Sequence, residues 1–164
     1  MKVNKFLPAL LACMLLFSIA GLAQSAKLPP FRVLQSNGKV FRAEDLPMGK
    51  PIVIIYFSPE CDHCQALMKD FFKSSAGFKK ASIAMITFLT VDKVTKFERD
   101  YHLNKYSNIY AGTEGTSYFL KNYYKIQDLP FVALYNKNGE LQKLYTASDK
   151  GALKDVIERL NKLK

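Results

Sequence analysis

The segment from Ile52 to Cys64 (IVIIYFSPECDHC) constrains the fold more than any other part of the sequence. It opens with Ile52 to Phe57, an unbroken β-branched and aromatic run that is typical of a strand buried on both faces of a sheet. Ser58-Pro59-Glu60 ends the run, and apolar residues then recur at helical spacing. They are Cys64, Leu67, Met68, Phe71 and Phe72. The sequence therefore predicts a strand, a short loop, and a helix that begins near Cys61.

This arrangement makes the two sulfurs unequal. Cys61 falls in the first helical turn, where backbone N–H groups have no intrahelical partner and the helix dipole favours an anion. The thiolate is the reactive form of a cysteine, so this position favours attack by Cys61. Cys64 lies on the buried stripe, near enough to resolve a mixed disulfide formed at Cys61. We predict that Cys61 is the nucleophile, Cys64 the resolving thiol, and that the pair cycles through a Cys61–Cys64 disulfide.

Residues 1–26 are typical of a secretory signal peptide. A basic start with Lys2 and Lys5 precedes the apolar run from Phe6 to Ala23, and small or polar residues follow it up to Ala26. We therefore expect an exported protein, periplasmic if the source is bacterial, with a mature domain at 27–164. Two alternatives stay open. The run approaches the lower length limit for an uncleaved membrane anchor, and Cys13 suits a lipidation box, although the apolar run continues well past it.

Removal of the leader leaves Cys61 and Cys64 as the only cysteines. A structural disulfide that closes so short a loop removes little chain entropy, so a chemical role fits the pair better. The net charge of +10 comes from basic residues scattered among acids. That pattern predicts a solvated surface, with attraction to an anionic membrane or an acidic partner as the alternative. We expect a monomer that meets protein thiol or disulfide substrates and a redox partner protein, without nucleic acid, cofactor or metal.

The rest of the chain predicts alternating strands and helices. The expected strands are Phe31 to Gln35, Lys39 to Ala43, Ser82 to Val91, Ser107 to Ala111, Phe131 to Tyr135 and Glu140 to Thr146. The expected helices are Asp92 to His102, Thr116 to Lys125, and a last one that Ser148 or Asp149 can cap. This order indicates an α/β fold with a central mixed β-sheet flanked by helices, an N-terminal β-hairpin and a central insertion.

The segment Ile52 to Cys64, together with Asp128-Leu129-Pro130-Phe131 before a closing strand, resembles the thioredoxin superfamily. The N-terminal hairpin and the segment Asp92 to Lys125 resemble its exported TlpA-like branch of thiol-disulfide oxidoreductases. The resemblance covers nearly all of residues 31–163. It implies a thioredoxin-like fold and a protein-disulfide oxidoreductase. It also implies a cis Pro130 that faces Cys61 and a Leu129 backbone that contacts the substrate chain.

Three positions near the cysteines depart from the thioredoxin pattern or modify it. Glu60 replaces the usual Trp, and Ile55 replaces the buried carboxylate that precedes the first cysteine by six residues. Glu60 and Asp62 are therefore candidate proton acceptors for Cys64, or simply solvated loop acids. His63 is a candidate catalytic residue, because an imidazolium would stabilise a nearby thiolate. The two acids oppose that effect, and the direction of electron flow stays open.

Two other functions compete with disulfide exchange. A copper or zinc carrier would use the two thiolates and His63, with His102 as the only further histidine of the mature chain. The other alternative is a peroxide-reducing redoxin of the same fold, although such an enzyme usually carries Thr where this chain has Cys61. The aromatic cluster of Tyr118, Phe119, Tyr123 and Tyr124 is predicted to pack internally, with a substrate-facing patch as the alternative.

Overall fold

The computed structural model describes residues 26–163. The predicted leader, residues 1–26, therefore lies outside the described residues except for Ala26. In the part of the chain that the structure describes, no helix combines the length and the apolar character needed to cross a membrane.

Seven strands form one mixed sheet in the order β2-β1-β5-β4-β3-β6-β7. The strands are β1 (Arg32–Leu34), β2 (Val40–Arg42), β3 (Ile52–Tyr56), β4 (Ser82–Thr87), β5 (Ile109–Thr113), β6 (Phe131–Tyr135) and β7 (Leu141–Tyr145). The helices are α2 (Asp62–Lys73), α3 (Val91–Asp100), α4 (Phe119–Tyr123) and α5 (Ala152–Lys162). β3, β4 and β5 run parallel, whereas the other pairings are antiparallel. The predicted mixed sheet with an N-terminal hairpin is confirmed.

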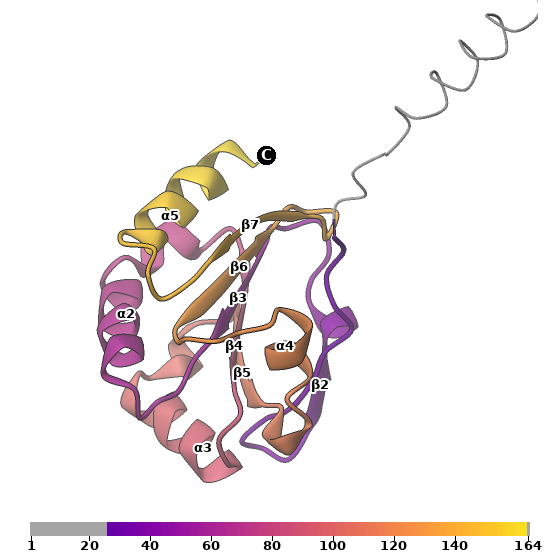
Figure 1. Ribbon diagram of the computed structural model, residues 1–164, viewed down its shortest axis with the longest axis vertical. Coiled ribbons are helices and arrows are strands. Elements are labelled where there is room, and N and C mark those ends of the chain that lie inside the picture. Colours follow the sequence, from indigo (N-terminus) through magenta and orange to yellow (C-terminus); the bar gives the residue numbers. More distant parts are fainter. Residues whose placement is uncertain (1–25, 164) are drawn as a thin grey trace, which may run out of the picture.

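The sheet separates two apolar cores. α2, α3 and α5 cover one face and α4 the other, as Figure 1 shows. β3 contributes alternate residues to both cores: Val53 and Ile55 to the first, Ile54 and Tyr56 to the second. This burial on both faces explains the unbroken apolar sequence of β3. It also fixes the position of the C-terminal end of β3, where the chain leaves the sheet toward Cys61.

A buried polar contact holds the end of β3. The Tyr56 hydroxyl donates a hydrogen bond of 2.6 Å to Oε1 of Glu114, the residue that follows β5. Oε2 of the same carboxylate accepts the backbone N–H of Leu120 in α4, at 2.8 Å. Glu114 thus satisfies two buried donors. It joins β3, β5 and α4 at the C-terminal end of β3, from which the chain continues to the cysteines.

Some predicted elements differ in length or in their start. The strand predicted for Ser82 to Val91 ends at Thr87, because α3 already begins at Val91. The helix predicted from Thr116 is interrupted, because Tyr118 adopts a left-handed conformation with φ 45° and only α4 follows it.

The predicted cap of the last helix is wrong. Gly151, with φ 75°, occupies the N-cap of α5, which begins at Ala152. Asp149 instead accepts hydrogen bonds from the backbone N–H and the hydroxyl of Thr146, at 2.7 and 2.8 Å. Neither Asp149 nor Ser148 reaches the helix start, because a turn separates them from it.

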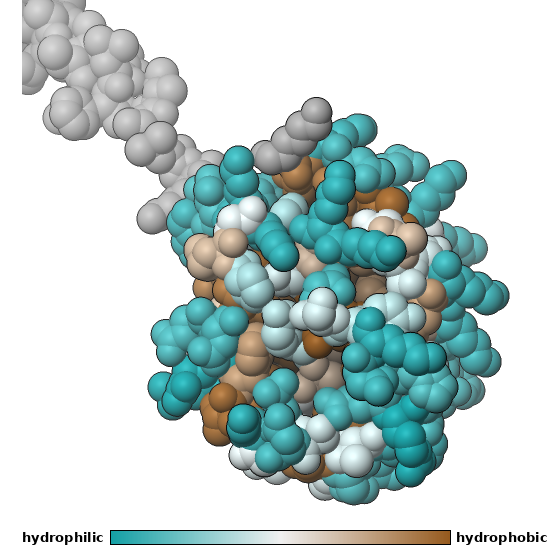
Figure 2. Space-filling model, turned by 180° about the vertical axis from the view of Figure 1, so that it is seen from behind, coloured by the Kyte–Doolittle hydropathy of each residue, from teal (hydrophilic) through white to brown (hydrophobic). Residues whose placement is uncertain are grey.

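The outer surface is largely polar. Figure 2 shows hydrophilic side chains over most of the face opposite to the view of Figure 1, with apolar areas in small separate spots. The large apolar side chains that are exposed in residues 26–163 are Leu34, Val40, Met48, Phe119, Tyr123 and Leu144.

We expect Glu114→Ala to destabilise the protein by about 1–3 kcal/mol, because it leaves two buried donors without an acceptor. Urea unfolding of the reduced protein measures the loss. Glu44→Ala is the matched control, because the Glu44 side chain is 79% exposed. Equal stability of the two variants would contradict a structural role for the Glu114 contact.

Candidate active site

The dithiol lies where β3 passes into α2. Cys61 is the N-cap of α2, and its carbonyl oxygen accepts the first helical hydrogen bond from Gln65 N–H, at 2.9 Å. The N–H of Cys61 donates to the Ser58 carbonyl oxygen at 3.1 Å, so the loop is closed just before the helix. Cys61 is half-buried and Cys64 is buried, and both are free thiols. The structure therefore describes the dithiol state of the predicted pair.

The two thiols differ in their surroundings. Cys64 is 0% exposed and belongs to the core beneath α2. Burial raises its pKa to about 12, and the adjacent Cys61 sulfur adds to this effect. The N–H of Ser58, which lies 3.5 Å from Sγ of Cys64, acts in the opposite direction. Cys64 is consequently a protonated thiol near neutral pH, whereas Cys61 reaches the surface.

Neither of the predicted proton acceptors, Glu60 and Asp62, contacts the Cys64 thiol. Ile55 is buried in the same core and has no proton-accepting group. The Glu60 side chain is 57% exposed, and its Oε1 lies 2.5 Å from Nζ of Lys93 on α3. Asp62 is exposed in the first turn of α2. The interactions described for the Cys64 thiol involve Ser58 and Cys61 only.

A cavity of about 20 Å³ adjoins the buried thiol. It is lined by Phe57, Ser58, Pro59, Cys64, Gln65, Met68, Phe97 and Tyr101. Its volume suffices for one water molecule. Pro59, Gln65, Phe97 and Tyr101 also line a groove of about 520 Å³ between the dithiol loop and α3. The cavity and the groove thus adjoin on the side of Cys64 that faces α3.

The predicted cis peptide bond between Leu129 and Pro130 is confirmed. β6 pairs antiparallel with β3, with Phe131 opposite Tyr56, so Leu129 and Pro130 lie at the same end of the sheet as the dithiol loop. Pro130 is buried, and half-buried Leu129 packs against both cores. This places both residues beside the chain that leads to Cys61.

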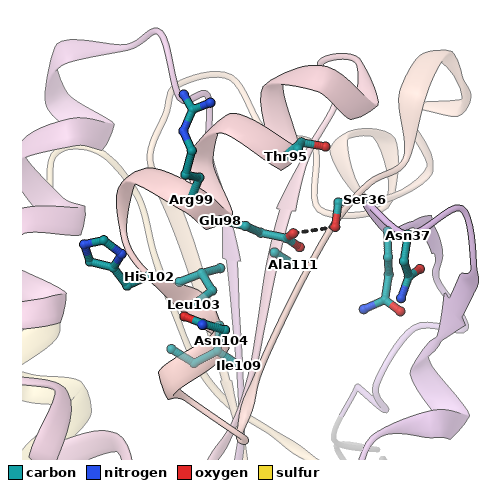
Figure 3. Close-up of a pocket in the computed structure, with 11 residues that line it drawn as sticks. Ser36, Asn37, Thr95, Glu98, Arg99, His102, Leu103, Asn104, Ile109 and Ala111 are labelled. Carbon is teal, nitrogen blue, oxygen red and sulfur yellow. Dashed lines mark hydrogen bonds between the residues drawn. The ribbon is translucent and has the colours of Figure 1, made fainter.

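The two histidines lie apart from each other. His63 is exposed in the first turn of α2. His102, exposed and left-handed with φ 52°, lines a separate pocket of about 530 Å³ between α3 and the turn after β1. There the Glu98 carboxylate accepts a hydrogen bond from the Ser36 hydroxyl (Figure 3). Neither cysteine lines that pocket, and residues 26–163 contain no group of three His, Cys, Asp or Glu side chains arranged to hold a metal ion.

The predicted aromatic cluster divides into two kinds of environment. The ring centroid of Tyr124 lies 4.9 Å from that of Phe131, and the Tyr124 hydroxyl forms a hydrogen bond with the Tyr135 hydroxyl. Phe119 and Tyr123 are exposed and stack on each other with ring centroids 6.1 Å apart. Packing is therefore confirmed for Tyr124, while Phe119 and Tyr123 form an exposed aromatic pair on α4.

Two residues of this region, Lys93 and Glu114, are not among those predicted from the sequence. Both make contacts to residues far away in the sequence, at Glu60 and Tyr56. No local motif surrounds either of them. A lysine in the first turn of a helix and an acid after a short strand carry no signal until the tertiary structure brings their partners close.

Comparisons with known proteins agree with this architecture. The model of the AhpC/TSA family matches residues 25–159. No curated protein matches the sequence significantly. The chain is similar to the crystal structure of the peroxidoxin BcpB from Mycobacterium tuberculosis, with a TM-score of 0.72, 12% identity, and coverage of 86% of this chain and 97% of that one.

Two further solved structures are similar. One is a secreted disulfide oxidoreductase of Mycobacterium tuberculosis, homologous to DsbE of E. coli, with a TM-score of 0.63, 18% identity, and coverage of 79% and 96% of the two chains. The other is an exposed lipoprotein thioredoxin of Streptococcus pneumoniae, with a TM-score of 0.59, 19% identity, and coverage of 80% and 99%. At these identities the likeness establishes the predicted thioredoxin-like fold.

We expect iodoacetamide at pH 7 to modify Cys61 of the reduced protein and to leave Cys64 unmodified, because Cys64 is buried and protonated. Mass spectrometry of the digested protein measures each site. Protein unfolded in guanidinium is the control, and there both cysteines should react. Modification of the two thiols at similar rates in the folded protein would contradict the described asymmetry.

Burial of Cys64 also predicts a loss of stability in alkali. Its pKa is raised from 9.0 to about 12, so the folded state holds this proton more tightly than the unfolded state. The resulting stability is complete below pH 9 and decreases at higher pH, by up to about 1.4 kcal/mol per pH unit. Urea unfolding of the dithiol protein between pH 8 and pH 10.5 should therefore show a steeper loss than in Cys64→Ala. Parallel pH profiles would contradict it, because both proteins share the same buried tyrosines.

Proposed function

The chain belongs to the AhpC/TSA family, and from this membership we propose that it is a thiol–disulfide oxidoreductase acting on exported proteins. One observation carries the proposal. A half-buried thiol at a helix N-terminus stands one turn before a fully buried, protonated thiol. A nucleophile and a resolving thiol need this difference, because the first must meet the substrate and the second must wait for the mixed disulfide.

In the reducing direction, the Cys61 thiolate attacks one sulfur of a substrate disulfide. A bond forms between Cys61 Sγ and that sulfur, and the other substrate sulfur leaves as a thiolate. Cys64 then loses its proton and attacks Cys61 Sγ. The Cys61–Cys64 disulfide forms, and the first substrate sulfur leaves as the second thiolate. The substrate gains two electrons and the dithiol loses two; oxidation of a substrate follows the same steps in reverse.

The proton of Cys64 must leave the core during the second attack. Within residues 26–163 no carboxylate contacts the thiol, so the cavity of about 20 Å³ beside it is the route that we infer. One water there would accept the proton and pass it to the groove beside α3. In this proposal Glu60 and Asp62 do not take the proton directly, and the departing substrate thiolate is the other acceptor.

The neighbouring residues have proposed roles of their own. Leu129 would offer its backbone to the substrate chain beside Cys61, and Pro130 would form the wall behind it. His63, exposed in the first turn of α2, would stabilise the Cys61 thiolate when protonated. The leader predicted at residues 1–26 supports an exported protein, periplasmic in a bacterium, that receives electrons from or delivers them to a redox partner protein.

Peroxide reduction is the second candidate, favoured by the family match and by the similarity to a peroxidoxin. In that reaction a cysteine thiolate attacks one oxygen of the peroxide, the O–O bond breaks, water or an alcohol leaves after taking up a proton, and the cysteine becomes a sulfenic acid. The thiol of the other cysteine then displaces the hydroxyl group, which leaves as water, and the disulfide forms. Cys61 is the reachable thiol for this step as well. Consumption of hydrogen peroxide and of an alkyl hydroperoxide by the reduced protein, compared with Cys61→Ser, tests it.

The proposed function predicts distinct behaviour of two variants in the reduction of insulin by dithiothreitol. We expect Cys61→Ser to lose the protein's acceleration of insulin precipitation entirely, because no nucleophile remains. We expect Cys64→Ser to lose most of it and to accumulate a mixed disulfide at Cys61, visible by non-reducing electrophoresis and mass spectrometry. Full activity of Cys61→Ser would refute the proposal.

A further inference from the structure

Lys93 of α3 pairs with the residue that immediately precedes the nucleophile. Its Nζ lies 2.5 Å from Oε1 of Glu60, on the groove between the dithiol loop and α3. The hydrogen bond and the negative charge of Glu60 raise the pKa of Lys93. The ammonium is therefore charged near neutral pH, and it compensates the carboxylate next to Cys61.

We propose that Lys93 is a positioning residue that sets the redox balance of the Cys61–Cys64 pair by neutralising and holding Glu60. The inference rests on the proposed function, which it deepens by naming a charge pair that shifts the equilibrium between the dithiol and the disulfide. An unpaired carboxylate at position 60 would repel the Cys61 thiolate. Pairing with Lys93 removes that repulsion and leaves the positive end of the α2 dipole to act on the sulfur.

The other charged groups around Cys61 do not replace this pair. Asp62 and His63, on α2 itself, are exposed, and so is Asp128 in the loop before β6. None of these three forms an ion pair within residues 26–163, and Lys96 and Asp100, which line the same groove, pair with each other. Cys64, behind Cys61, is protonated. Lys93 is the charged group that α3 brings to the residue preceding Cys61, with its side chain 40% exposed.

The link to the redox balance follows from the state of the reduced pair. A dithiol reductant converts the Cys61–Cys64 disulfide into a Cys61 thiolate and a Cys64 thiol, and it releases one proton as it forms its own disulfide. The protein S–S bond breaks, two electrons enter the protein, and the negative charge stays on Cys61. Whatever stabilises that charge stabilises the reduced protein and makes the disulfide a stronger oxidant.

The test uses two substitutions that break the same ion pair but change the charge in opposite directions. Lys93→Gln leaves Glu60 uncompensated, so the Cys61 thiolate is disfavoured. We expect slower alkylation of Cys61 at pH 6, a higher pH midpoint of alkylation, and an equilibrium with dithiothreitol shifted roughly twofold to fivefold toward the disulfide. Glu60→Gln leaves Lys93 as a free cation, and each of the three readouts should shift the opposite way.

Two controls separate charge from structure. Lys96→Gln removes an ammonium from the same helix that pairs with Asp100 instead of Glu60, and it should leave all three readouts at their wild-type values. The double variant Glu60→Gln/Lys93→Gln should return close to wild type. Added salt should reduce the differences between the single variants, because the pair is solvent-accessible.

A purely structural role of the ion pair predicts a different result, namely shifts in the same direction for both single variants. That outcome, or no shift in either variant, would overturn the inference. These readouts need only the two cysteines and small reagents. Failure to act on protein disulfides would therefore contradict the proposed function and leave the charge effect measurable.

Discussion

Burial of β3 on both faces is the constraint on which the rest of the structure depends. Its residues fill the core under α2, α3 and α5 on one side and the core under α4 on the other. The strand lies in the interior of the sheet, between parallel β4 and antiparallel β6. The position of the C-terminal end of β3 is therefore fixed. This end of the sheet brings together the loop after β3, the start of α2 and the Leu129–Pro130 peptide bond.

Burial also creates the chemical difference between two identical side chains. Cys64 follows Cys61 by three residues, and this helical spacing places its sulfur in the core beneath α2, whereas Cys61 stays at the helix N-terminus. Loss of water at Cys64 raises its pKa to about 12, whereas Cys61 keeps contact with solvent at the helix N-terminus. The proposed division of labour between nucleophile and resolving thiol thus rests on helix geometry and desolvation, since none of the residues 26–163 places an acid or base in contact with the buried sulfur.

The absence of such an acid among the described neighbours of Cys64 changes how the site has to work. Ile55 contributes packing where a carboxylate would contribute proton transfer, and the small cavity toward the groove at α3 is the route that we propose for the proton. The same groove carries the Glu60–Lys93 pair. The proposed proton exit and the proposed charge effect at Cys61 both lie on the α3 side of the dithiol, within the segment that the sequence predicts as an insertion.

The sequence alone determined the strand–loop–helix around the cysteines, the unequal placement of the two thiols, and the order of elements. These features arise from local periodicity, and local periodicity is written in consecutive residues. The sequence alone did not determine the cap of α5, the break at Tyr118, the Glu114–Tyr56 contact or the partner of Glu60. The Glu114–Tyr56 contact and the partner of Glu60 depend on residues that only the tertiary structure brings together, whereas the cap of α5 and the break before α4 follow from the left-handed backbone of Gly151 and Tyr118. Glu60 could be read as a repelling acid from its position in the chain, but the packing of α3 against the loop decided that its charge is compensated.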